Sequence, residues 1–150
     1  MVMAKNIVDY SKGRREYLDT LHTQGIFGLK PSIDNKDQAL FLAALGCDKP
    51  VPLSSKKDPG GWFRTDSVTK YSHDVAMLSC LLLGTAQCDE DYDRFSQLEM
   101  YMDYVEQCAE SGFRVVEAKL EEAGNDNNLL ERLMLKELDL LYTALVENDL

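Results

Sequence analysis

The sequence predicts an all-α, single-domain bundle of about five helices, with one long Pro/Gly loop that has room for a short β-hairpin. Three observations predict this fold class. The length of 150 residues fits one domain of ordinary size. Apolar residues make up 45 % of the chain and charged residues 28 %, as in globular proteins. Apolar side chains also recur at spacings of three and four, which is typical of helices that bury one face.

Two short helices are expected after a loose N-terminal arm over residues 1–13. The first covers residues 14–23 and ends at Gln24-Gly25, because glycine suits a helix C-cap. Ser32 or Asp34 caps the second helix, which runs to Leu45 and ends at Gly46.

An irregular loop is expected over residues 46–66. No continuous helix can pass through its prolines and glycines, which are Pro50, Pro52, Pro59, Gly60 and Gly61. Trp62 and Phe63 follow these residues and could anchor the loop to the core. Loops of this length are often functional.

Three longer helices are predicted beyond the loop, over residues 66–83, 89–122 and 127–147. Gly112 interrupts the second of them and indicates a kink or a close helix crossing, since glycine is unfavourable in a helix interior.

The last helix is unusually apolar. Leu135 and Leu140 widen its apolar stripe beyond one face, so the helix is either central or shared with a partner chain. We expect self-association into a homodimer through leucines of this stripe, namely Leu130, Leu133, Leu138, Leu141 and Leu145.

Charge is divided unevenly along the chain. The net charge is −10, but residues 1–60 carry nine basic and seven acidic side chains, whereas residues 61–150 carry seven basic and 19 acidic. General binding to DNA or RNA is therefore disfavoured. A local contact with a partner remains open where basic and aromatic residues interleave, at Lys56, Lys57, Trp62, Phe63 and Arg64, although such lysines commonly just face solvent.

No catalytic or metal-binding set is recognisable. The four cysteines form no Cys-x-x-Cys pair and are expected to be reduced and buried. Asp89, Asp91 and Asp93 begin like a calcium loop, but the positions that need Gly and Glu hold Arg94 and Met100. His22 and His73 are the only histidines, and Asp74 is expected to point away from His73 along a helix. We therefore predict no enzyme, no metal and no cofactor.

The location expected from the sequence is cytoplasmic, with no membrane contact. No apolar run approaches the 18 residues of a membrane helix, and the first residues lack the hydrophobic segment of a secretory signal.

Two blocks of sequence carry a family resemblance. The first comprises Gly25-Ile26-Phe27, Asn35-Lys36-Asp37, Leu40-Phe41 and Ala43-Ala44-Leu45-Gly46, and the second runs from Val105 to Phe113. Together they resemble the small Dnd system-associated proteins found beside bacterial DNA phosphorothioation and restriction genes. The second block departs from that pattern at Cys108 and Glu110, where the family has Tyr and Asn. The resemblance implies a prokaryotic accessory protein linked to defence against foreign DNA, and it supplies no catalytic residues.

The function expected from these observations is that of a non-enzymatic accessory or interaction protein with a protein partner. Two alternatives remain open. One is a nucleic-acid-linked regulator that uses the basic N-terminal third. The other is an acidic nucleic-acid mimic that occupies a basic groove of another protein.

Overall fold

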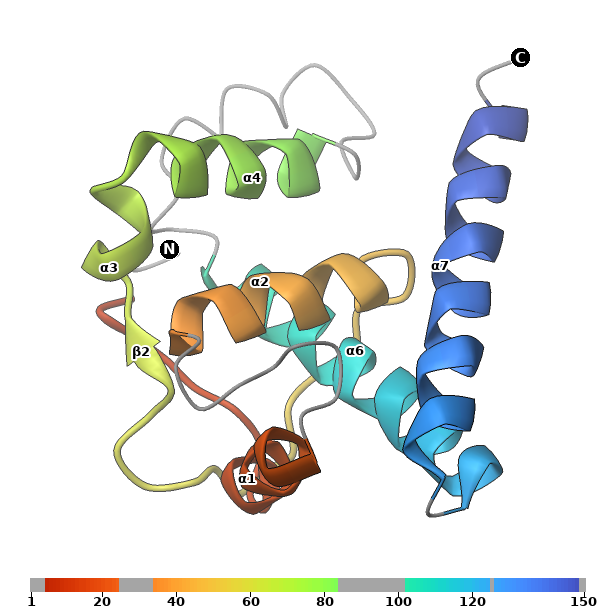
Figure 1. The fold of residues 1–150 in the computed structure, drawn as a ribbon. Helices are drawn as coiled ribbons and strands as arrows, with labels where there is room; N and C mark the ends of the chain where they lie inside the picture. Colours follow the sequence, from red (N-terminus) through yellow and green to blue (C-terminus); the bar gives the residue numbers. More distant parts are fainter. Residues whose placement is uncertain (1–4, 25–33, 84–101, 125, 149–150) are drawn as a thin grey trace.

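The fold is mainly helical, as the sequence predicted (Figure 1). The computed structural model describes residues 5–24, 34–83, 102–124 and 126–148, and for 20–24, 72, 79–83, 127, 141, 145 and 148 it describes the backbone alone. The elements in order are β1 (Ile7–Val8), α1 (Arg14–Gln24), α2 (Asn35–Gly46), β2 (Phe63–Arg64), α3 (Asp66–Thr69), α4 (Ser72–Leu83), α6 (Met102–Ala123) and α7 (Asn127–Asn148).

The helix boundaries lie close to the expected ones except in two places. The helix expected over residues 66–83 is divided into α3 and α4, with a turn at Lys70–Tyr71. The first part of the helix expected over residues 89–122 lies outside the described residues, and α6 begins at Met102.

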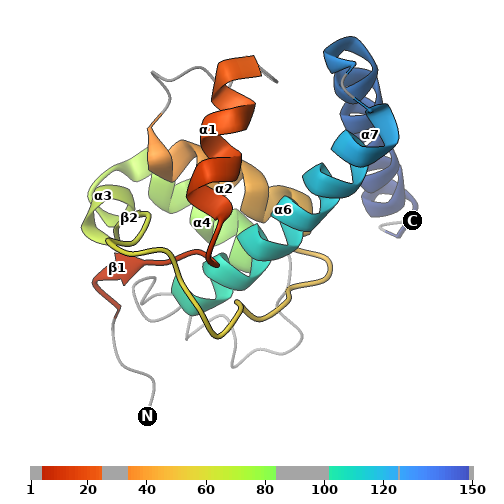
Figure 2. The ribbon, with the colours of Figure 1, turned by 90° about the horizontal axis from the view of Figure 1, so that it is seen from below.

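The core is built on a close crossing of α2 and α6, which Figures 1 and 2 show side by side. Glycine is required at both contact points. A Cβ atom on Gly112 would overlap the carbonyl oxygen of Leu42, and one on Gly46 would overlap the carbonyl oxygen of Cys108. Gly112 therefore marks a close helix crossing, one of the two roles that its position in the sequence indicated.

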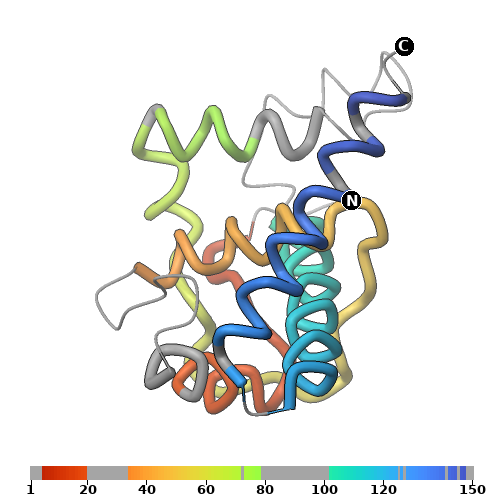
Figure 3. The backbone as a smooth tube through the Cα atoms, turned by 45° about the vertical axis from the view of Figure 1, so that its right-hand side comes forward, coloured from red at the N-terminus to blue at the C-terminus, as the bar shows by residue number. Residues whose placement is uncertain are grey.

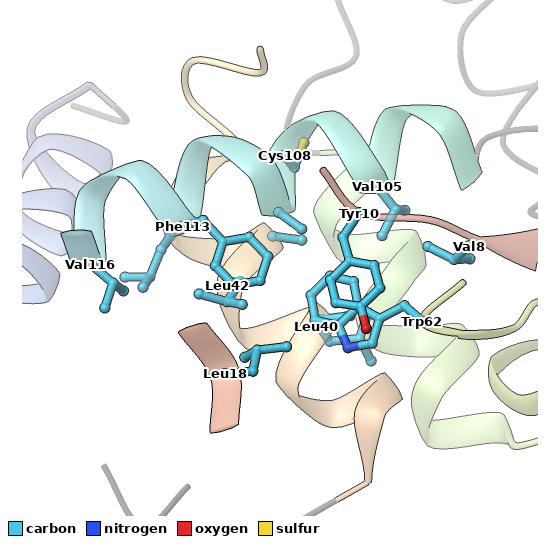
Figure 4. Close-up of a cluster of buried hydrophobic side chains, with 14 of the residues drawn as sticks. Val8, Tyr10, Leu18, Leu40, Leu42, Trp62, Val105, Cys108, Phe113 and Val116 are labelled. Atoms are coloured by element: carbon cyan, nitrogen blue, oxygen red, sulfur yellow. The ribbon is translucent and has the colours of Figure 1, made fainter. Parts of the chain in front are cut away.

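Aromatic rings fill the space beside this crossing (Figure 4). Trp62 is only 5 % exposed and stacks on Tyr10, with 5.1 Å between ring centroids and 13° between ring planes. Its ring also lies 5.5 Å from that of Phe113 of α6, which is fully buried. Trp62 thus anchors the long loop to the core.

The N-terminal arm is part of the fold. β1 pairs antiparallel with β2, with Val8 opposite Phe63, and Val8 and Tyr10 are buried on the inner side of the arm. The expectation of a loose arm over residues 1–13 is therefore wrong for residues 5–13. The strands pair between the arm and the end of the loop, and not within the loop. In the arm, Ile7 is exposed whereas Val8 and Tyr10 are buried, so the arm has one apolar side that packs on the core.

Helix α7 follows α6 after a turn at Gly124, whose φ of 62° is in the left-handed region (Figure 3). Leu130 and Met134 are fully buried and belong to the same core as α6. The ion pair between Lys119 of α6 and Glu137 of α7, 3.7 Å from Nζ to Oε2, lies on the same side of α7.

Candidate protein-interaction surface

The second half of α7 exposes large apolar side chains. The exposed fraction is 61 % for Leu135, 67 % for Tyr142 and 43 % for Val146, and Leu138 is half-buried. These four residues follow one another at spacings of three and four, so they share one side of the helix, which we call the outer α7 stripe. Figure 1 shows the upper part of α7 standing apart from α2 and α4.

The leucines predicted for self-association divide among several environments. Leu130 is fully buried in the core of the chain itself and cannot meet a partner, because α6 already covers it. Leu133 and Leu138 are half-buried, and the side chains of Leu141 and Leu145 lie outside the described residues.

The residues predicted for self-association did not include Leu135, Tyr142 or Val146. The width of the apolar stripe, which includes Leu135, was the sequence signal for an apolar side of the last helix beyond its core side. Sequence spacing alone did not show which side of the helix α6 covers. Leu140, which is 55 % exposed, lies on the opposite flank of α7 from Tyr142.

Charged side chains border the outer α7 stripe. Arg132, Lys136, Asp139 and Glu147 are all exposed, and their spacing places them on one edge of the stripe. None of the four forms an ion pair with another described residue. The edge is basic toward the start of α7 and acidic toward its end.

The cations and aromatic rings of the basic loop, where a local partner contact was left open, do not face solvent together. Trp62 is buried and Phe63 is half-buried. Lys57 Nζ lies 3.2 Å from Asp9 Oδ2, and Arg64 Nε lies 3.2 Å from Asp66 Oδ1. Lys56 is exposed. The cations therefore remain at the surface, whereas the tryptophan ring is not available for stacking on a base.

Basic residues of the N-terminal arm and of α1 hold these segments against α6. Arg14 pairs with Glu110 and with Glu117, each at 2.9 Å, and Lys5 Nζ lies 2.7 Å from Glu106 Oε1. Burial raises the pKa of Glu106, and hydrogen bonds from Lys5 and from the Asp9 amide oppose this shift. These contacts stabilise the fold.

A cavity of about 410 Å³ lies where α2, α4, β2 and α3 meet. Its lining includes Lys36, Tyr71 and His73. Lys36 Nζ lies 2.6 Å from Oδ2 of the buried Asp74, and 4.4 Å from the centroid of the Tyr71 ring. The hydrogen bond to Asp74 raises the pKa of Lys36.

The expectation that Asp74 points away from His73 is wrong. His73 Nε2 lies 3.1 Å from Asp74 Oδ1, because the exposed His73 and the buried Asp74 are neighbours in the first turn of α4 and their side chains bend toward each other. Ser67, the one serine lining this cavity among the described residues, donates its hydroxyl to the Arg64 carbonyl at 2.6 Å and makes no described contact with His73. Lys36, His73 and Asp74 therefore form a charged cluster at the start of α4, and no described nucleophile lies within hydrogen-bond distance of His73.

The described cysteines are structural. Cys47 and Cys108 are free thiols, and burial raises the pKa of Cys108 to about 12. A thiol with so high a pKa is a poor nucleophile at neutral pH. Cys88, the Asp89–Asp93 cluster and the side chains of His22 and Cys80 lie outside the described part. Within that part, no group of three or more His, Cys, Asp or Glu side chains is arranged to hold a metal ion.

Comparisons with known proteins give no match to a family model, to a curated protein or to a solved structure. None of the described helices has the combination of length and apolar character needed to cross a membrane.

Proposed function

We propose that this protein is a non-enzymatic interaction protein whose outer α7 stripe is its contact surface for another protein chain. The observation that carries the proposal is the exposure of Leu135, Tyr142 and Val146 on a helix whose other side is already packed on α6. Contiguous exposed apolar residues with a polar border are typical of protein–protein contact sites.

The chemistry of the described residues supports a non-catalytic role. A hydrolytic site needs a nucleophile within hydrogen-bond reach of a base. The exposed His73 is paired with Asp74, and Ser67 is bonded elsewhere. Cys108 is buried with a raised pKa.

The resemblance to Dnd system-associated proteins leads us to propose DNA modification-restriction or anti-phage defence as the setting. The two blocks that carry this resemblance suggest a prokaryotic accessory protein. A cytoplasmic location belongs to the proposal and is supported by the free thiols Cys47 and Cys108, since reduced cysteines are usual in that compartment.

A role as a nucleic-acid-linked regulator finds less support. It needs cations and rings that face solvent together, whereas Trp62 is buried and both Lys57 and Arg64 are paired with carboxylates. The mimic alternative rests on the acidic balance alone, which a solvated helical surface also explains.

A site-specific photo-crosslinker tests the proposal in the native cell. Placed at position 142 in full-length protein, it should yield a defined crosslinked species that contains this chain and one identifiable protein. Placed at Leu140, on the opposite flank of α7, it should not yield that species. Equal crosslinking from both positions, or none from either, would contradict the proposal.

A further inference from the structure

We propose that the outer α7 stripe binds a second copy of this chain, with the two α7 helices antiparallel about a two-fold axis. This inference rests on the proposed function, and it names the partner at that surface. The argument combines the shape of the apolar stripe with the order of charges along its edge.

The apolar stripe suits a helix partner. Leu135, Leu138, Tyr142 and Val146 are spaced at 3, 4 and 4 residues, which is the pattern that packs against a neighbouring helix. The stripe extends over about 16 Å at 1.5 Å per residue. Each copy therefore offers the same row of side chains, as a two-fold interface requires.

The α7 side that faces α6 remains available for the chain's own core in this arrangement. Leu130 and Met134 are fully buried there, and Glu137 pairs with Lys119 of α6. No described side chain of α7 beyond Leu138 is buried. The dimer would cover this second half without removing any contact between α6 and α7.

The order of charges along this edge suits the antiparallel orientation. Arg132 and Lys136 lie toward the start of the edge, and Asp139 and Glu147 lie toward its end. In an antiparallel pair, the basic half of each helix meets the acidic half of the other. In a parallel two-fold pair, this edge of each helix would lie against the other flank of its partner, so the basic and acidic halves of the edge would not meet. Complementary edge charges are a known determinant of helix pairing and orientation.

The first test measures the oligomeric state of the purified full-length protein by sedimentation equilibrium at micromolar concentration. We expect a dimer. Tyr142→Asp should weaken the dimer about 10-fold or more, because a carboxylate would be buried without a partner. Leu140→Asp is the matched control, since Leu140 is similarly exposed on the opposite flank, and it should leave the dimer unchanged.

Both variants should fold, because both side chains are exposed, and circular dichroism checks this. A folded Tyr142→Asp protein that dimerises like the wild type would overturn the proposal. Equal weakening by Leu140→Asp would do the same, since the contact would then not be specific to the outer stripe.

The second test addresses orientation. Arg132→Glu should weaken the dimer several-fold, and the double variant Arg132→Glu/Glu147→Arg should restore it, because the exchanged charges again face opposite charges in an antiparallel pair. In a parallel two-fold pair, positions 132 and 147 do not meet, so the exchange could not restore the dimer. Failure of the double variant to recover would therefore overturn the antiparallel arrangement.

These results separate the two proposals. A strictly monomeric purified protein would overturn the homodimer. If the crosslinker at position 142 still captured a different protein in cells, the proposed function would stand without it. Loss of both the dimer and the crosslink would remove the interaction role of α7 altogether.

Discussion

Gly46 and Gly112 set the distance between α2 and α6. At each position, the neighbouring helix occupies the space in which a side chain would begin, and the blocking atoms include backbone carbonyl oxygens. Backbone atoms of a packed helix cannot move aside as a flexible side chain can. The crossing therefore depends on the absence of a Cβ atom at these two positions.

Gly112→Ala should lower the free energy of unfolding by about 3 kcal/mol, at the upper end of the usual cost of overpacking, because the new methyl group meets the Leu42 backbone. Alanine would otherwise favour the helix by about 1 kcal/mol. Urea denaturation measures the change. Glu121→Ala, exposed on the same helix, should have little effect. A Gly112→Ala protein as stable as the wild type would contradict the close crossing.

Cys108 should make stability fall at alkaline pH. Burial raises its pKa from 9.0 to about 12, so the folded state holds the thiol proton that the unfolded state loses. The stabilisation is fully present below pH 9 and is lost as the pH rises toward 12. From pH 8 to pH 10 the loss is about 1.4 kcal/mol.

Urea denaturation at several pH values compares the wild type with Cys108→Ala. The variant should lose less stability over this range, whatever its stability at pH 8. Parallel pH profiles for the two proteins would show that the thiol is not the group responsible.

Some of the residues that carry the family resemblance lie where α2 crosses α6. Leu45 and Gly46 of the first block lie in α2, Cys108 and Gly112 of the second lie in α6, and the two blocks meet at the crossing. Sequence reasoning identified Gly46 as the end of a helix and Gly112 as a kink or a close helix crossing. It could not pair them, because their contact joins segments far apart in the chain.

At the level of elements, carboxylates of α6 hold the N-terminal arm in place. Glu106 is only 4 % exposed, accepts a hydrogen bond from the backbone amide of Asp9 and pairs with Lys5. Burial would lower the pKa of Lys5, but its hydrogen bonds and charge interactions with Glu106 and Asp103 raise it overall. The pair therefore links the arm to the central helix.

Glu106→Ala should reduce the free energy of unfolding by about 2–3 kcal/mol, because it leaves Lys5 and the Asp9 amide without their buried acceptor. Asp103→Ala is the control, because Asp103 also pairs with Lys5 but its side chain is 62 % exposed. This variant should lower the free energy of unfolding by about 0.5 kcal/mol or less. Equal effects of the two variants in thermal and urea denaturation would count against a special role for Glu106.

Sequence reasoning failed at β1 and at the break between the short helix α3 and α4. Periodicity predicted the positions of α1, α2 and α7, whose apolar faces repeat over several turns. β1 pairs with β2 over only two residues in each strand, and β2 lies far along the chain from β1. The turn at Lys70–Tyr71 has no Gly or Pro, so no local signal marked the break. Both features depend on tertiary contacts.

For the whole molecule, the net charge does not show that many of the basic side chains are bound to other groups of the fold. Arg14 is bound to carboxylates of α6, and Arg15 donates to the Tyr10 hydroxyl at 2.8 Å and to loop carbonyls. Lys57 is paired with Asp9. Much of the positive charge in the described part of the first 60 residues thus serves the fold, whereas Lys12, Lys49 and Lys56 are exposed.

We accordingly expect no shift of short duplex or single-stranded DNA in gel electrophoresis at low salt. Phosphate binding needs clustered, accessible cations and weakens steeply as salt rises. A shift at low salt that disappears on adding salt would favour the nucleic-acid-linked alternative. Lys56→Ala would then test whether the loop is responsible, since Lys56 is exposed.

The contact between α2 and α6 also bears on how the chain is made. While the ribosome synthesises α2, the helix that will cover Leu42 and Leu45 has not yet been made, because Phe113 and its neighbours come much later. Closing such a long loop is slow and cannot begin until both ends exist. The apolar face of α2 therefore stays uncovered through most of translation, and chaperones that bind nascent apolar segments have a long interval in which to act on it.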